Sequence, residues 1–109
     1  PPHSISLKEN TKDKDYLNSL IQGLDSFKDK KFDLILYQAG VDVLKEDSLG
    51  NLSLTMEGVM ERDRIVFSFS KERNIPLALV LGGGYSKPIY STVKAHINTY
   101  IVAKEIFNY

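Results

Sequence analysis

Residues 32–42, with the sequence FDLILYQAGVD, indicate the architecture of this chain more clearly than any other segment. Their first half, Phe32 to Tyr37, is a short and nearly continuous apolar run that follows a helical segment directly. Such runs are typical of strands that are buried on both faces of a parallel sheet. A second run of this kind, residues 77–81 (LALVL), follows Pro76. The two runs therefore predict two buried strands.

Segments with helical periodicity lie between and after these strands. Apolar residues recur every three or four positions over residues 13–30, which predicts an amphipathic helix. Thr55 is suited to be the N-cap of a second helix that ends near Asn74, and Pro88 is suited to the first turn of a third helix. The third helix has an apolar stripe that we expect to be buried, formed by Ile89, Val93, Ile97, Tyr100 and Ile101.

Residues 3–7 alternate weakly and predict a short strand before the first helix. The resulting order of strand, helix, strand, helix, strand, helix predicts an α/β fold with a parallel sheet, in which residues 1–109 form a single domain. Three strands are few for such a sheet, and the chain offers little to pair with the two apolar strands. We therefore expect part of the sheet to come from elsewhere, and we expect the isolated chain to self-associate through its unpaired edges.

Composition excludes several classes of protein. Lys plus Arg and Asp plus Glu both number 14, so bulk charge gives no support to binding of nucleic acid or of a membrane surface. The chain has no cysteine, which excludes disulfides and thiolate metal sites. It shows neither an apolar run long enough to span a membrane nor the organisation of a signal peptide. We expect a cytoplasmic protein without membrane or direct nucleic-acid partners.

Two segments at the predicted strand ends could carry chemistry, because ligands of parallel α/β sheets bind beyond the carboxyl ends of strands. Asp42 follows the first strand, and the glycines 82–84 with Tyr85 follow the second. Asp42 could be a metal ligand, a general base or a cap, and the Tyr85 hydroxyl could donate to a developing oxyanion. The glycines could admit a ligand close to the backbone or simply form a tight turn. Composition and spacing leave these alternatives open.

The same segments resemble the histone deacetylase superfamily, in which a strand leads into an Ala-Gly-x-Asp element and a glycine-rich loop ends in a tyrosine. Here these elements are residues 39–42 and 82–85. Further similar segments occur in the order of the family and extend the resemblance over nearly the whole chain: residues 47–52, 55–58, 61–63 and 95–100.

The resemblance implies a zinc-dependent deacetylase that acts on acetyl-lysine or acetylated polyamines. It implies an arginase/deacetylase-like fold, a three-layer α/β/α sandwich with helices on both faces of the sheet, of which this chain would be a C-terminal portion. Asp42 matches a zinc ligand, and Tyr85 matches the catalytic tyrosine that stabilises the oxyanion. Gly83 and Gly84 match the loop that lines the substrate tunnel.

The chain also departs from the family. Nothing in it matches the family's other zinc ligands or its paired histidines, which act as general acid and base. Since a catalytic zinc needs about three protein ligands, we expect the chain alone to be inactive. Two alternatives stay open: a nucleotide-binding module whose glycines hold phosphate, and a non-catalytic assembly module.

Overall fold

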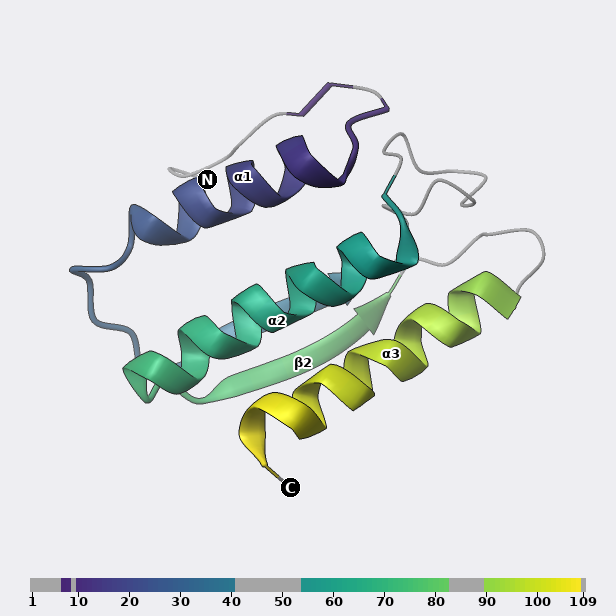
Figure 1. Cartoon of the computed structure of the whole chain (residues 1–109). Coiled ribbons are helices and arrows are strands. Elements are labelled where there is room, and N and C mark those ends of the chain that lie inside the picture. The colour runs from purple at the N-terminus through teal and green to yellow at the C-terminus, as the bar shows by residue number, and fades with distance from the viewer. Residues whose placement is uncertain (1–6, 9, 41–53, 83–89, 109) are drawn as a thin grey trace.

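The computed structural model of the chain describes residues 7–8, 10–40, 54–82 and 90–108. Helices and strands alternate along this part of the chain (Figure 1). They are α1 (Asp13–Asp25), β1 (Ile35–Gly40), α2 (Met56–Arg73), β2 (Leu77–Gly82) and α3 (Tyr90–Phe107). The predicted order is confirmed from α1 onward. The strand predicted at residues 3–7 falls mostly outside the described residues, and Leu7 itself is not in a strand.

The two apolar runs pair with each other in a parallel sheet, in which Ile35 lies opposite Leu77 and Gly40 lies opposite Gly82. Within the described residues each of these strands has one partner, so the sheet there has two strands. The first strand also begins later than predicted and continues to Gly40, because its pairing starts where the Ile35 N–H donates to the Pro76 carbonyl at 2.8 Å. Phe32 lies in the preceding connection, edge to face with Phe27.

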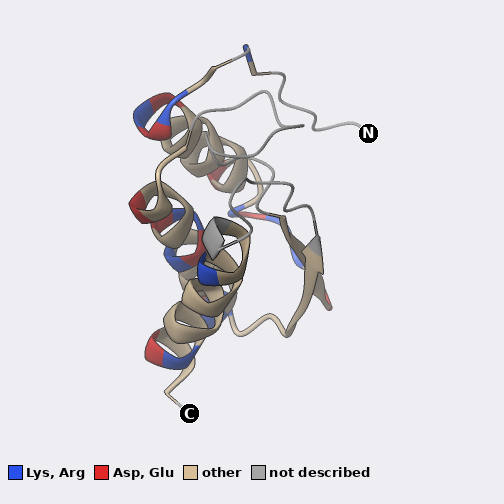
Figure 2. Cartoon of the chain, turned by 90° about the vertical axis from the view of Figure 1, so that its right-hand side faces the viewer, with Lys and Arg blue, Asp and Glu red and all other residues tan. Residues whose placement is uncertain are grey.

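All three helices lie on one side of this sheet (Figure 2). On that side Ala39 is fully buried, and Tyr37 packs with its ring edge to face against Phe67 of α2. On the other side Leu36 is 70% exposed and Val80 is 44% exposed. The strands were predicted to be buried on both faces; within the described residues, only the face toward the helices is covered. This part of the chain forms two layers, one of strands and one of helices.

Two clusters of buried side chains hold the structure together: one packs the helices against each other, and one also packs them against the sheet. One contains Leu54, Val59 and Ala95. The other contains Phe67, Val102 and Ala103, with apolar side chains of both strands packed around it. Burying a large apolar side chain of this kind stabilises a fold by about 1.5–3 kcal/mol.

The buried face of α3 differs from the predicted one. Ile97 is 53% exposed, and Val93, Tyr100 and Ile101 of the same predicted stripe are also exposed. The buried residues of α3 are small or β-branched instead: Thr92, Ala95, Thr99, Val102 and Ala103. Small side chains at a helix contact let the two axes approach closely, so α3 presents its smaller face to α2 and leaves its larger apolar face exposed.

The start of α2 is tied to the start of α1. Thr55 is the predicted N-cap, and its side chain accepts a hydrogen bond from the Gly58 N–H at 3.0 Å. The Asp13 carboxylate in turn accepts hydrogen bonds from the Thr55 N–H, at 2.8 Å, and from its hydroxyl. A Cβ atom at Gly58 would collide with this carboxylate, which explains a glycine within the first turn of a helix.

Charged side chains gather on the helices, whereas the two strands contain no Lys, Arg, Asp or Glu (Figure 2). The predicted end of α2 is confirmed, with Asn74 in the left-handed conformation that ends helices. α1 ends at Asp25, before the predicted Lys30, in a turn over residues 26–29. No described helix combines the length and the apolar character needed to cross a membrane.

Candidate functional site

The carboxyl ends of β1 and β2 lie side by side, because Gly40 and Gly82 are register partners in parallel strands. The chain leaves this edge of the sheet toward Asp42 after β1, and toward Tyr85 after β2. Asp42 and Tyr85, like Gly83 and Gly84, lie outside the described residues. The topology therefore supports a shared edge, while the distance between the two side chains stays a prediction.

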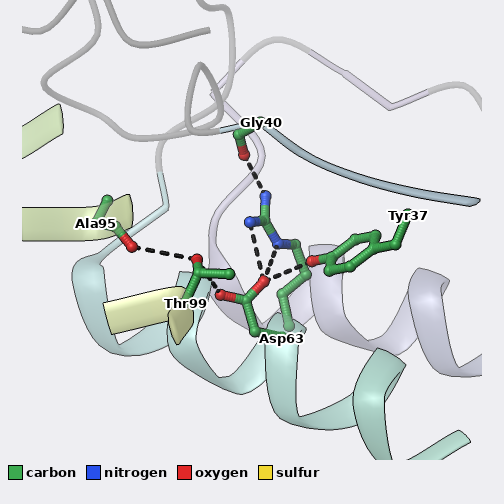
Figure 3. A network of polar contacts seen from close by, with 6 residues as sticks. Tyr37, Gly40, Asp63, Ala95 and Thr99 are labelled. Atoms are coloured by element: carbon green, nitrogen blue, oxygen red, sulfur yellow. Dashed lines mark hydrogen bonds and ion pairs between the residues drawn. The ribbon is translucent and has the colours of Figure 1, made fainter. Parts of the chain in front are cut away.

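A buried carboxylate lies directly behind this edge. Asp63 of α2 is 0% exposed, and its two oxygens accept hydrogen bonds from three side chains (Figure 3). Oδ1 accepts from the Tyr37 hydroxyl at 2.5 Å and from Nε and Nη2 of Arg62 at 3.1 and 3.0 Å. Oδ2 accepts from the Thr99 hydroxyl at 2.6 Å. We call these four residues, Tyr37, Arg62, Asp63 and Thr99, the Asp63 network.

Arg62 connects the Asp63 network to the sheet edge. While Nε and Nη2 of its guanidinium donate to Asp63, Nη1 donates to the carbonyl oxygen of Gly40 at 2.5 Å. The guanidinium is planar and rigid, so donors on its different sides can serve two acceptors at a fixed angle. The last residue of β1 is thereby linked to the interior of α2.

The local sequence accounts for much of this arrangement. Asp63 interrupts the apolar stripe of α2, which predicts a carboxylate paired with Arg62, with Arg64 or with a backbone donor. Of these, Arg62 is the partner that the structure shows. Tyr37 alternates inward on β1, and Thr99 lies on the face of α3 that packs on α2. Sequence reasoning missed both as partners. The available signals were a hydroxyl within an apolar strand and a threonine within an apolar helix.

Two groups of the Asp63 network have shifted pKa values, the Tyr37 hydroxyl and the Arg62 guanidinium, and both shifts favour the protonated form that donates hydrogen bonds. Burial raises the pKa of Tyr37; the positive charge of Arg62 opposes this, and Asp63 adds to the rise, so Tyr37 stays a donor. Burial alone would lower the pKa of Arg62, but the oxygens of Tyr37 and Asp63 outweigh it and raise the pKa, so the guanidinium stays charged. Arg62 and Asp63 therefore form a buried ion pair.

His96 lies near this pair on α3. Burial and then the charge of Arg62 lower its pKa, while Asp63 opposes the shift, so the imidazole is neutral at physiological pH. Its Nδ1 atom is buried and has no hydrogen-bond partner among the described residues. The position of His96 within the apolar stripe of the third helix predicts a hydrogen-bonded core histidine, and this is not met at Nδ1 within the described residues.

In the part of the chain that the structure describes, no group of three or more His, Cys, Asp or Glu side chains is arranged to hold a metal ion. Asp42 offers the kind of donor that zinc accepts, a carboxylate oxygen. A zinc site would therefore need ligands from outside the described residues, and the assignment of Asp42 as one of them stays a prediction.

Comparison with known proteins shows similarity along almost the whole chain. Residues 3–101 match the histone deacetylase domain family. An uncharacterized protein of Picosynechococcus sp. is 36% identical over 104 residues, which are 94% of this chain and 35% of that protein. Histone deacetylase 2 of Arabidopsis thaliana is 36% identical over 84 residues, which are 76% of this chain and 22% of that protein.

A solved structure has the same fold. The acetylpolyamine aminohydrolase from Burkholderia pseudomallei superposes with a TM-score of 0.80 at 14% identity, over 94% of this chain and 28% of that one. The parallel sheet with its helices therefore matches part of the arginase/deacetylase fold that the sequence predicts. The chain spans about a third or less of the length of these relatives.

Proposed function

Because this chain belongs to the histone deacetylase family, we propose that it forms part of a zinc-dependent deacetylase acting on acetyl-lysine or related acetylated amines. The observation that carries the proposal is the match over residues 3–101, which includes both Asp42 and Tyr85. The parallel pairing of β1 with β2 supports it, because both residues follow strands that end at one edge.

In this proposal each residue at the edge has its own role. Asp42 is a zinc ligand, and the Tyr85 hydroxyl donates a hydrogen bond to the oxyanion that develops on the acetyl carbonyl. The backbone of Gly83 and Gly84 lies along the acylated side chain of the substrate, where the absence of Cβ atoms leaves room. When bound, zinc would polarise the amide carbonyl and activate water.

The chain alone is expected to be inactive, since it supplies one of the roughly three protein ligands that a catalytic zinc needs. The test compares the 109-residue chain with the natural gene product that contains it, on an acetyl-lysine peptide and on an acetylated polyamine. We expect turnover by the gene product only, lost on treatment with a chelator and restored by zinc. Turnover that survives complete metal removal, or turnover by the chain alone, would contradict the proposal.

We further propose that the isolated chain self-associates with copies of itself. Leu36 on the open face of the sheet and Ile97 on the open face of α3 are both more than half exposed, and each strand has a single partner within the described residues. Open strand edges and apolar patches of this kind recruit other chains.

Sedimentation of the isolated chain over a range of concentrations measures this association. We expect oligomers that dissociate on dilution, and a shift toward monomer in the double variant Leu36→Gln/Ile97→Gln. The control is Lys28→Gln, a change of an exposed side chain on the turn after α1, which should leave the distribution unchanged. A wild-type chain that stays a well-folded monomer at high concentration would show that these surfaces need no partner.

The family match gives no support to a nucleotide-binding module or to a non-catalytic assembly module. A cytoplasmic location stays a prediction, as does the absence of nucleic-acid and membrane partners.

A further inference from the structure

α1 is the least buried of the three helices. It lies at the edge of the helical layer, beside α2 and on the side opposite to α3 (Figure 1). Every residue of α1 is described, and none of them is buried, whereas α2 buries Val59 and Phe67 among others. An element with few buried apolar side chains can open locally while the rest of its domain stays folded.

The apolar contact between α1 and α2 is incomplete. A hollow of about 270 Å³ lies between the two helices, and its lining includes Ile21 and Leu24 of α1 and Ile65 and Phe69 of α2. Ile21 is 50% exposed. Closely packed elements leave few gaps larger than a water molecule. The hollow therefore removes part of the dispersion attraction that would otherwise hold α1 on α2.

Polar contacts join the two helices at their N-terminal ends. The Asp13 carboxylate accepts hydrogen bonds from the Thr55 N–H, at 2.8 Å, and from the Thr55 hydroxyl. It also fills the space beside Gly58, where a Cβ atom would collide with it. Hydrogen bonds to a carboxylate are among the strong ones, and the positive pole of the α2 dipole favours a negative charge here. We call these contacts of Asp13 with Thr55 and Gly58 the Asp13 latch.

The two ends of α1 are attached differently. Near the Asp13 latch, Tyr16 packs against the buried cluster that contains Leu54 and Val59. Beyond the other end, residues 28–34 form a connection in which every residue is exposed, so it can act as a hinge. We propose that α1 is a detachable helix, which the Asp13 latch holds on α2 and whose release leaves β1, β2, α2 and α3 folded. This inference concerns a conformational change and does not depend on the proposed zinc site.

Native-state hydrogen exchange of the natural gene product, read by mass spectrometry on peptides from each element, tests the proposal. In the wild type, the amides of α1 should exchange faster than those of α2. Asp13→Ala should accelerate exchange in α1 by roughly 10–100-fold, the effect of losing hydrogen bonds to a charged group, and leave β1, β2 and α3 at wild-type rates. The control is Asp15→Ala, which removes an exposed charge from the same turn of α1 and should leave exchange unchanged.

Gly58→Ala breaks the Asp13 latch from the other side. Its Cβ would displace the Asp13 carboxylate from Thr55, so exchange in α1 should accelerate as it does in Asp13→Ala. In the Asp13→Ala background the same change meets no carboxylate and should add nothing to exchange in α1, since alanine is also a better helix former than glycine. Such non-additivity identifies two residues that act through one contact.

Three results would overturn the proposal. If α1 exchanges as slowly as α2 in the wild type, it opens only with the whole domain. If Asp15→Ala accelerates exchange as much as Asp13→Ala, the charge of the helix end accounts for the effect and the latch does not. If Asp13→Ala accelerates exchange in all elements alike, or prevents folding, Asp13 supports the whole fold. None of these results bears on zinc binding or turnover, so the proposed function and this inference can fail separately.

Discussion

The variant Asp63→Ala is expected to lose about 3–5 kcal/mol of stability, the loss typical of a buried ion pair from which one partner is removed. The reason lies in what remains: Arg62 would keep its charge in a site from which water is excluded, with the Gly40 carbonyl as an acceptor but no carboxylate. The hydroxyls of Tyr37 and Thr99 would lose their acceptor as well. Since domains are stable by only about 5–15 kcal/mol, this loss should also lower the yield of folded protein.

Urea unfolding of the natural gene product measures this effect, and Arg64→Ala is the matched control. Arg64 follows Asp63 directly in α2, but its ion pairs with Glu61 and Glu105 are exposed and span 3.5 and 3.8 Å. Exposed pairs contribute little, so the control should change stability by less than about 1 kcal/mol. A similar small loss for Asp63→Ala would mean that the Asp63 network is not isolated from water.

The variant Tyr85→Phe is expected to lower the deacetylation rate of the gene product by roughly 10²–10³-fold, the loss typical when one donor to an oxyanion is removed. Only the hydroxyl is lost, so zinc content and folding should stay as in the wild type. Asp42→Asn should abolish turnover too, but with a lower zinc content, because an amide oxygen is a weaker ligand than a carboxylate. Steady-state kinetics together with metal analysis distinguish the two roles.

A matching substitution of an exposed residue serves as the control for each of these two variants. Tyr100→Phe removes a hydroxyl from an exposed tyrosine of α3, and Asp25→Asn removes a charge at the end of α1, paired with Lys28 across 3.9 Å. Both should keep wild-type activity and metal content. If Tyr85→Phe also kept its activity, the tyrosine would not be the oxyanion donor and the assignment carried by the resemblance would be wrong.

Local sequence signals predicted the elements of the fold where those signals act over a few residues. Thr55 and Asn74 mark the ends of α2, because an N-cap oxygen and a left-handed C-cap satisfy backbone groups within one turn of the helix. The apolar runs predicted both strands, and the motif order predicted the family. Asp42 and Tyr85 could be named from sequence alone, since their motifs are contiguous.

Prediction failed where the outcome depended on which element packs against a helix or a strand. Apolar spacing in α3 predicted that Ile97 and Tyr100 would be buried, but α2 packs closely against Ala95 and Thr99 instead. Periodicity shows that a helix has an apolar stripe, and it carries no information about which neighbour covers that stripe. In the same way, the apolar run around Leu36 could not show that its boundaries would follow the register with Leu77.

The sequence by itself determined the alternation of helices and strands, the caps of α2 and the residues proposed for catalysis. Only the tertiary structure decided that β1 and β2 are neighbours, and that Tyr37, Arg62 and Thr99 meet at Asp63 (Figure 3). The separations explain the difference: Tyr37 and Thr99 lie 26 and 36 residues from Asp63 along the chain. Local propensity acts within a turn or a strand, whereas such contacts form only once three elements pack together and exclude water from the charges between them.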